Sequence, residues 1–584
     1  MTGHAALVRW PFTVKMREDA MPGLYWKSKL LAAGAVLLLG SAAHADTIVL
    51  RSARVLTMDD AKPEAQAIAL VDGRIAAIGS DVDVEPFFKD AKIYDLPADA
   101  LVLPGFQDSH NHLIWSATQG KNVDMTDVAD AGALRDAMTP ALAALADGAW
   151  LRADFWDNGV YADGSAAILD PITGDRPTYI ESLDGHSAWV NTAALKAAGI
   201  DASTKDPEGG RIERDAQGNP TGLLREKAME LVSNLLPDYP ESQVDAALQE
   251  AQAEAIGYGI TAIIDPSTEE WMLKGYQRAD AADKLKLRVE AAIKVEAGNE
   301  SPVGSVIKLK NTYTGPHLEV TSVKLFVDGV IETGTAALLE AYVGSNSSGE
   351  LLFTQEELNE IAVAADAADL QLHAHAIGDR AVRATLDAYE AAQKANGKRD
   401  SRHQITHLEL VDPADVPRFK ELGVIANIQA LWAYPDTYIV DLTQPKIGPE
   451  RSEWLYPFGA LKEAGATLAG SSDWSVSSMN PLEAIQTGVT RQDIADPDGA
   501  VLTPQHKLDV MDMLRAYTVN GAYAAFDEAE SGTLSKGKRA DVVVLDKDVT
   551  KVPATEIASA KVLLTLIDGE PAHEGEGLPK PTGP

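Results

Sequence analysis

Short apolar runs separated by turns make up both ends of the chain. Near the N-terminus such β-rich segments occur at 47–50, 54–58, 68–71, 75–78 and 92–96. The same pattern returns near the C-terminus at 542–545 and 562–567. This spacing predicts a small antiparallel sheet at the N-terminal end. We expect residues 46–103 and 523–584 to combine into one β-sandwich domain.

Residues 104–522 show a different pattern, in which β-rich runs alternate with Ala-rich helical stretches such as 355–368 and 380–395. This alternation is typical of βα units around a parallel sheet. Nine candidate strands end near His110, Leu183, Asp265, Ile293, Asp328, His375, His407, Gln429 and Asp473. A closed barrel needs eight, and the interval from His110 to Asp265 is too long for one βα unit. The pattern therefore predicts an α/β fold, a (β/α)8 TIM barrel whose rim insertion, at about 115–250, contains the spare strand near Leu183.

Composition excludes several functional classes. The 584 residues are 45% apolar and carry a formal net charge of −36, a field that repels phosphate backbones and anionic lipid. We therefore expect no nucleic-acid partner and no binding to a membrane surface. The chain has no Cys, which excludes disulfides, thiolate metal sites and Cys nucleophiles. Any metal must be held by His, carboxylate or a modified side chain.

The N-terminal region predicts export. Leu30–Ala43 is an apolar run preceded by Lys27 and Lys29 and followed by His44-Ala45. This layout is typical of a signal peptide, and the run is shorter than the roughly 20 residues of a spanning helix. We expect residues 1–45 to be removed near Ala45, giving a periplasmic or secreted protein; an uncleaved anchor is the alternative. Met21 is an alternative start.

His110 and His112 close an apolar run that reads Leu-Pro-Gly-Phe-Gln-Asp-Ser-His-Asn-His over residues 103–112. On a strand, residues i and i+2 share a face, so both imidazoles could bind one metal. Two surface histidines on a loop are the alternative.

This His-x-His segment, with Asp72-Gly73-Arg74-Ile75 and the glycine-rich stretch 532–541, resembles the metal-dependent amidohydrolase superfamily. Three further blocks, at 184–191, 323–329 and 375–381, resemble its YtcJ-like branch within amidohydrolase family 3, which includes N-substituted formamide deformylase. The resemblance covers essentially the whole mature chain. It implies an enzyme, a metal-dependent hydrolase acting on carbon–nitrogen bonds other than peptide bonds.

The resemblance also implies a two-metal site. His110 and His112 would hold the first ion with Asp473, and His375 and His407 the second. Lys324 would be carboxylated by carbon dioxide and bridge the two ions. A lysine in an apolar strand has the lowered pKa that this reaction needs; an ordinary salt-bridged lysine is the alternative. Zinc is the expected metal, with manganese, iron and cobalt as alternatives.

Two catalytic roles follow from the same resemblance. A bridging hydroxide would attack the carbonyl, and Asp473 would carry the proton to the departing amine. His186, in the insertion, would polarise the carbonyl or stabilise the oxyanion. Helix capping is the alternative for Asp473, and capping near Asn191 is the rival account of the His186 block. His373 shares strand parity with His375 and is expected to be a hydrogen-bond donor behind the ligands. His403 shares strand parity with His407 and is likewise expected to support them.

The expected reaction is hydrolysis of an amide, N-formyl or N-acyl bond in a small-molecule substrate. An ester, carbamate or cyclic amide is the nearest alternative, because the same hydroxide attacks any activated carbonyl. Ring deamination is disfavoured, because Gly378 replaces the expected Glu three residues after His375. A non-catalytic exported metal- or solute-binding protein is the alternative from another class. The oligomeric state is open between monomer and homo-oligomer.

Overall fold

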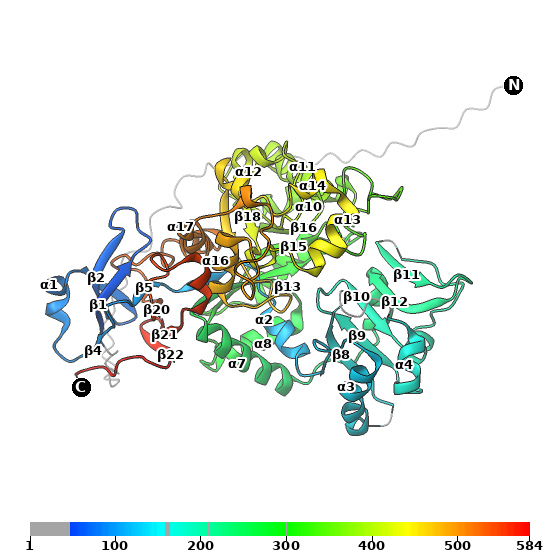
Figure 1. The fold of residues 1–584 in the computed structure, drawn as a ribbon, viewed down its shortest axis with the longest axis horizontal. Helices are drawn as coiled ribbons and strands as arrows, with labels where there is room; N and C mark the ends of the chain where they lie inside the picture. Colours follow the sequence, from blue (N-terminus) through cyan, green and yellow to red (C-terminus); the bar gives the residue numbers. More distant parts are fainter. Residues whose placement is uncertain (1–46, 147, 158–163, 208, 300, 584) are drawn as a thin grey trace, which may run out of the picture. The chain divides into compact units, whose positions relative to one another are not determined.

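The structure, a computed structural model, describes residues 47–146, 148–157, 164–207, 209–299 and 301–583 (Figure 1). The predicted signal peptide lies outside the described residues. The described backbone forms three sheets, and the functional residues lie around the parallel sheet that forms the barrel.

A parallel sheet of eight strands forms the barrel. The strands in spatial order are β6 (Phe106–Asp108), β13 (Ile260–Thr268), β14 (Arg288–Lys294), β15 (Leu318–Phe326), β16 (Gln371–Ala376), β17 (Gln404–His407), β18 (Ile425–Ile428) and β19 (Thr467–Gly470). The Ser109 N–H donates to the Gly470 carbonyl at 3.1 Å, which brings the ends of β6 and β19 together. The predicted TIM barrel is confirmed.

Helices connect these strands. They include α7 (Glu241–Gly257), α8 (Glu270–Ala281), α9 (Pro302–Thr312), α10 (Gln355–Ala367), α11 (Asp379–Asn396), α12 (Val416–Leu422) and α15 (Phe458–Glu463). Helix α10 begins at a capping box in which Thr354 and Glu357 satisfy each other's backbone N–H groups. Helix α11 ends before Gly397, whose φ of 88° suits glycine. Both helices lie within a residue or so of the predicted stretches.

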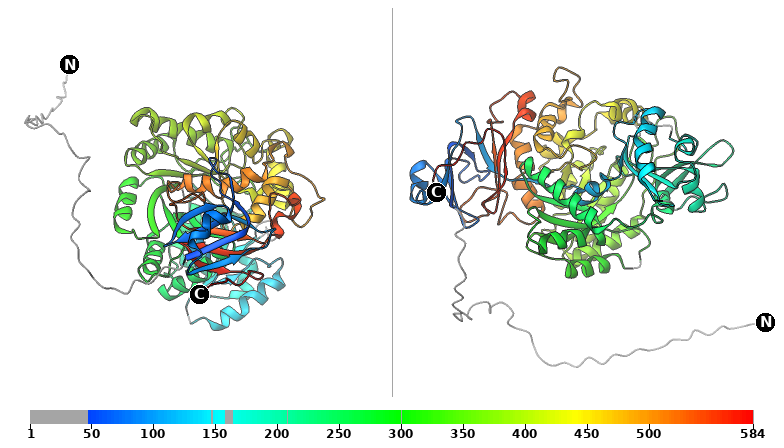
Figure 2. Two further views of the ribbon diagram at one scale, coloured as in Figure 1. Left: turned by 90° about the vertical axis from the view of Figure 1, so that its left-hand side faces the viewer. Right: turned by 90° about the horizontal axis from the view of Figure 1, so that it is seen from below.

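Both chain ends build a second sheet. Strands β1 (Thr47–Leu56), β2 (Glu64–Val71), β3 (Arg74–Gly79), β4 (Ala91–Asp95) and β5 (Leu101–Pro104) join β20 (Val542–Leu545), β21 (Val562–Ile567) and β22 (Glu570–Glu574). The link is the antiparallel pairing of β5 with β20, visible where the blue and red strands lie side by side (Figure 2).

The expectation of a purely antiparallel N-terminal sheet is wrong. Strand β1 pairs in parallel with β4 and with β5. The reason is the short helical connection Asp81–Phe87, which carries the chain back so that β4 runs in the direction of β1.

A third sheet of six strands lies between β6 and β13 in the sequence. Its spatial order is β11 (Gly210–Arg214), β12 (Pro220–Glu226), β10 (Ser187–Val190), β9 (Thr178–Ser182), β8 (Leu151–Trp156) and β7 (Val123–Asp124). The ninth candidate strand near Leu183 is β9, so it belongs to this sheet and not to the barrel.

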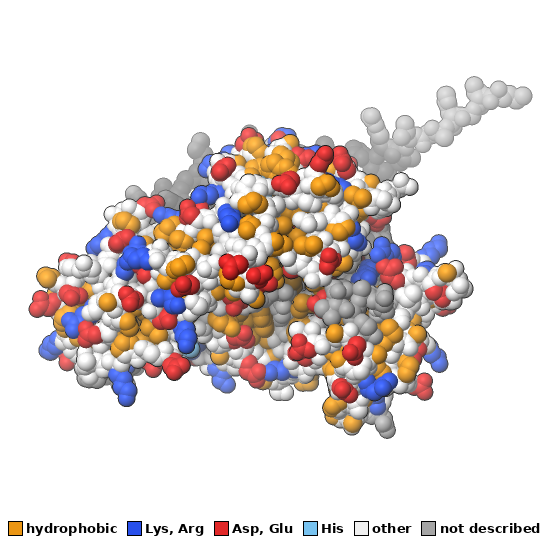
Figure 3. All heavy atoms as spheres, in the orientation of Figure 1, with side chains coloured by type: hydrophobic (Ala, Val, Ile, Leu, Met, Phe, Trp, Pro, Cys, Tyr) orange, Lys and Arg blue, Asp and Glu red, His pale blue; other side chains and the backbone are white. Residues whose placement is uncertain are grey.

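Acidic and basic side chains are interspersed over the face seen in Figure 3. Among the described residues, none of the helices combines the length and the apolar character needed to cross a bilayer.

Candidate active site

A cavity of about 1170 Å³ opens at the carboxyl ends of the barrel strands. All seven residues predicted for the site line it: His110, His112, His186, Lys324, His375, His407 and Asp473. Six of them lie near or just beyond the carboxyl ends of barrel strands, and His186 comes from the loop between β9 and β10.

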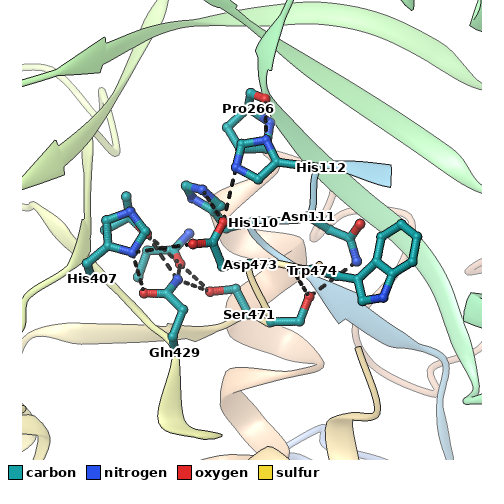
Figure 4. Close-up of polar contacts among 12 residues, drawn as sticks. His110, Asn111, His112, Pro266, His407, Gln429, Ser471, Asp473 and Trp474 are labelled. Atoms are coloured by element: carbon teal, nitrogen blue, oxygen red, sulfur yellow. Dashed lines mark hydrogen bonds and ion pairs between the residues drawn. The ribbon is translucent and has the colours of Figure 1, made fainter. Parts of the chain in front are cut away.

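Asp473 lies at the centre of the histidine cluster (Figure 4). Its Oδ1 is 3.2 Å from His110 Nε2 and 3.0 Å from His112 Nε2, and its Oδ2 is 3.9 Å from His407 Nδ1. Burial by itself raises the pKa of the Asp473 carboxyl, but the imidazoles of His110 and His112 outweigh it and hold that pKa well below its usual range. The carboxylate is therefore ionised at neutral pH.

Each of the four histidines has one ring nitrogen occupied by the protein. His112 Nδ1 donates to the Pro266 carbonyl at 3.0 Å, and His407 Nδ1 lies 3.0 Å from Gln429 Oε1. His375 Nε2 lies 3.3 Å from the Gly329 carbonyl oxygen, and His110 Nδ1 is 2.8 Å from His373 Nε2. The other nitrogen of each ring is left to bind a ligand, an arrangement usual for metal-binding histidines.

Gln429 fixes the tautomer of His407. The Gln429 amide nitrogen donates to Ser471 Oγ at 2.6 Å and lies 3.1 Å from Thr406 Oγ1. Its Oε1 must therefore face His407 and accept the Nδ1 proton, which leaves the lone pair on Nε2. Burial also lowers the pKa values of His110, His375 and His407 well below the usual range, so all three are neutral.

Lys324 is fully buried, and its Nζ has no hydrogen-bond partner in the part of the chain that the structure describes. Burial lowers the pKa of this amine to about 7. The salt-bridge alternative is wrong, because no carboxylate of the described residues lies within 4.0 Å of Nζ. A buried amine that is partly neutral can act as a nucleophile toward carbon dioxide.

Asp108 ties the first and last barrel strands together at the site. Its Oδ1 accepts from the Ser472 N–H at 3.0 Å, and its Oδ2 accepts from Ser472 Oγ at 2.5 Å and from Asn111 Nδ2 at 2.9 Å. The Asp473 N–H in turn donates to the His110 carbonyl at 2.8 Å. These bonds place Asp473 against the His-x-His segment.

Asp473 does not cap a helix. Helix α16 (Pro481–Thr490) begins seven residues beyond Ser472-Asp473-Trp474 and is capped by Asn480, whose side chain accepts from the Leu482 N–H. Instead Asp473 adopts the left-handed conformation, with φ of 55°, as does His407 with φ of 77°. Such backbone strain costs of order 1–3 kcal/mol and is concentrated at functional sites.

His186 approaches the cluster from the insertion. Its ring centroid lies 5.1 Å from that of His375, and its Nδ1 is 2.9 Å from Glu226 Oε2. Burial alone lowers the pKa of His186, but the charge and hydrogen bond of Glu226 offset it and raise that pKa to about 9. Asn191 caps helix α5 (Thr192–Ala197), as the alternative interpretation of this block expected. The cap does not involve His186, so it does not exclude a role of His186 at the site.

The two supporting histidines differ. His373 bonds His110 directly but does not line the cavity. His403 accepts from the Leu372 N–H through Nδ1 at 3.1 Å and is removed from the site, so its role is structural.

The residues present fit a metal ion. His110, His407 and Asp473 offer ligand atoms within 4.8 Å of one another. His110 Nε2 and Asp473 Oδ1 are buried yet make no well-directed hydrogen bond to any described residue, and a buried polar atom without a partner is costly. A cation between them would satisfy both atoms.

Sequence reasoning assigned no role to Gln429 or Glu226. Gln429 lies 22 residues after His407, and Glu226 lies 40 residues after His186. The only signal for Gln429 was its place at the end of the seventh barrel strand.

The fold and the site are those of a metal-dependent hydrolase, and comparison with known proteins agrees. The amidohydrolase family pattern matches residues 93–573, and the chain belongs to this family. It is 27% identical over 531 residues to the amidohydrolase YtcJ of Bacillus subtilis (strain 168), covering 89% of this chain and 98% of that one. It is also 27% identical over 553 residues to N-substituted formamide deformylase of Arthrobacter pascens, covering 91% and 99%. These matches support the YtcJ-like branch.

The protein LONG AFTER FAR-RED 3 of Arabidopsis thaliana is 32% identical over 566 residues, covering 94% of each chain. Among solved structures, an uncharacterized metal-dependent hydrolase from Pyrococcus horikoshii matches with a TM-score of 0.69 and 23% identity, covering 87% of this chain and 99% of that one. The match to the Pyrococcus horikoshii structure supports the fold.

Proposed function

We propose that the protein hydrolyses an amide-type carbon–nitrogen bond, of an N-formyl or N-acyl amine. The observation that carries this proposal is the arrangement around Asp473. Four histidines leave one ring nitrogen each for a ligand, and they surround an ionised carboxylate and a buried lysine whose amine has no hydrogen-bond partner among the described residues.

Two divalent ions, zinc first, would be held by His110, His112, His375, His407, Asp473 and a carboxylated Lys324. When bound, such ions polarise a carbonyl and lower the pKa of water. The preference for zinc follows from the imidazole-rich ligand set.

The side chains of the protein divide the remaining work. Asp473 Oδ2, the oxygen farther from His110 and His112, accepts a proton from the attacking water and returns it to the departing amine. The His186 imidazolium donates a hydrogen bond to the carbonyl oxygen as negative charge develops there. Trp432 stacks on His407 with ring centroids 5.2 Å apart and forms an apolar wall beside the reacting group.

Amide hydrolysis is favoured over ester hydrolysis because a poor amine leaving group needs a proton donor, and Asp473 and His186 supply proton transfer and oxyanion stabilisation together. The name of the formamide deformylase relative supports an N-formyl substrate.

A screen of N-formyl and N-acyl amines against the matched esters, with elemental analysis of the same preparation, tests the proposal. Release of amine that depends on bound metal is expected. A protein that holds metal but releases no amine from any member would instead fit the solute-binding alternative.

We also propose that the protein is exported with cleavage near Ala45. The basis is the Lys-flanked apolar run and the Ala-x-Ala that follows it. N-terminal sequencing of the exported protein tests this, and retention of residues before Leu30 would contradict it.

A further inference from the structure

A chain of polar side chains runs through the interior of the barrel, beneath the proposed metal site. Its members are at most 3% exposed and lie on strands β16 to β19 or on the residue just after a strand: Gln371, Gln404, Asn427, Gln429 and Ser471. Branched apolar side chains usually fill this space in a TIM barrel. A buried polar chain is stable only when its groups are paired, and the pairing gives each group a fixed direction.

The direction of the chain is set at the amino end of β16. Gln371 Nε2 donates to the Arg402 carbonyl at 2.6 Å and to the Ala524 carbonyl at 2.9 Å. A carbonyl oxygen only accepts, so both amide hydrogens of Gln371 are used and its Oε1 must accept. This Oε1 accepts from Gln404 Nε2 at 2.9 Å, which turns Gln404 Oε1 toward Asn427.

Asn427 receives the same direction from two sides. Its Nδ2 donates to Gln404 Oε1 at 2.9 Å and to the Ser109 carbonyl at 2.8 Å. Its Oδ1 is therefore the end that faces Ser471 and Gln429. It accepts from Ser471 Oγ at 2.5 Å and lies 3.2 Å from Gln429 Nε2. Asn427 thus presents an acceptor to the side chains nearer the site.

This acceptor orients Gln429, which contacts His407 (Figure 4). Ser471 gives its single hydroxyl hydrogen to Asn427, so its oxygen accepts from Gln429 Nε2 at 2.6 Å. Gln429 Oε1 is then left to accept from His407 Nδ1, which is 3.0 Å away. The His407 proton therefore lies on Nδ1, and the lone pair on Nε2 is free for a metal.

We propose that Asn427 is a positioning residue that determines which nitrogen of His407 binds the metal. A reversed Gln429 would present an N–H group to His407 Nδ1, and the His407 proton would then occupy Nε2 and block it. Asn427 opposes this reversal, because it would bring Gln429 Oε1 against Asn427 Oδ1. The inference rests on the proposed metal site, but the tautomer of His407 does not depend on hydrolysis.

Nitrogen NMR of the full-length protein reads the tautomer. The protein is prepared with isotope-labelled histidine and freed of metal by a chelator. A protonated ring nitrogen and one with a lone pair give separate signals, and those of His407 are identified by their loss in His407→Gln. We expect the proton on Nδ1 in the wild type. A proton on Nε2 would overturn the proposal without any further variant.

Two variants of Asn427 have opposite expected results. Asn427→Leu keeps the branched shape but removes both ends of the amide, so Gln429 is no longer oriented and the Nε2–H form of His407 should appear. Asn427→Asp keeps an acceptor toward Gln429 and loses the donor to Ser109 and Gln404. The wild-type tautomer should therefore persist in Asn427→Asp although the free energy of unfolding falls. If Asn427 only stabilised the fold, the tautomer would follow stability in both variants.

Zinc affinity, measured by competition with a chelator, is the second readout. We expect a loss of about 10- to 100-fold in Asn427→Leu, the usual effect of disturbing the groups that orient a ligating histidine. Asn191→Leu is the matched control, because Asn191 is equally buried and also uses both ends of its amide, at the start of α5. It should keep the wild-type tautomer of His407 and the wild-type affinity.

Three results would overturn the proposal: an unchanged tautomer in Asn427→Leu, a changed one in Asn427→Asp, or an equal loss of zinc affinity in Asn427→Leu and Asn191→Leu. If Asn427→Leu does not fold, the wild type and Asn427→Asp decide the question. If His407→Gln bound zinc as tightly as the wild type, the proposed metal site would fail, whereas control of the His407 tautomer by Asn427 would stand.

Discussion

The Nδ1 atom of His110 lies 2.8 Å from the Nε2 atom of His373, and both rings are fully buried. One hydrogen joins them, and its position depends on the tautomer of His110. If His110 Nε2 binds a metal, the proton must lie on Nδ1 and His373 must accept it. His373 then acts as an acceptor, whereas the sequence pattern predicted a hydrogen-bond donor.

Replacing His373 by Leu removes this acceptor while keeping the interior apolar. We expect metal affinity to fall by about 10- to 100-fold, the usual effect of losing the partner of a ligating histidine. Competition with a chelator measures it. His403→Leu is the control, because His403 is equally buried but bonds the backbone away from the cavity. Equal losses in both variants would mean that His373 only stabilises the fold.

Lys324→Ala removes the proposed bridge. We expect this variant to lose metal and to lose nearly all activity, because four histidines and one carboxylate would then face the ions without the anionic bridge. Added formate should restore part of both by replacing the carbamate oxygens. Elemental analysis with and without formate checks the prediction, and full metal content in the variant would contradict it.

The residues found from the sequence are those whose geometry is local. His110 and His112 share a face through the period of two along a strand, and both line the cavity. The ends of the barrel strands were also predictable, because alternation of strands and helices places each strand end at one rim. Lys324, His407 and Asp473 therefore meet as expected.

The partners of these residues were not predictable, because they depend on tertiary placement. Glu226 reaches His186 only because β12 pairs with β10, with Arg225 opposite Ser187. No periodicity within either strand encodes that register. Asp108 belongs to the segment 103–112 that contains His110 and His112. Its hydrogen bonds to Ser472 nevertheless join the first barrel strand to the last, and the sequence did not indicate them.

Glu226→Gln should change the pH dependence of the reaction. His186 has a pKa raised to about 9, so its imidazolium predominates below that pH. Activity that needs this donor is present at neutral pH and is lost as the pH rises through about 9. Without the Glu226 charge the pKa of His186 should fall toward its usual value of about 6.5, which moves the alkaline limb of kcat to lower pH.

The control is Glu241→Gln, because Glu241 lines the cavity but its side chain is largely exposed. Its pH profile should match that of the wild type. An alkaline limb that stays in place in Glu226→Gln would show that His186 does not act as the imidazolium.

Asp473→Asn separates the two roles proposed for Asp473. Asparagine keeps the size and one ligating oxygen but cannot carry a proton, so metal content should fall modestly while kcat falls by about 10²- to 10⁴-fold. The loss should be largest for an amide, since its amine leaving group needs the proton. A matched phenyl ester should lose less, because phenolate departs without protonation.

The measurement is kcat for the amide and the ester in the wild type and in Asp473→Asn, with metal content determined on the same samples. Equal losses at unchanged metal content would exclude leaving-group protonation by Asp473, and activity that follows metal content alone would reduce it to a ligand.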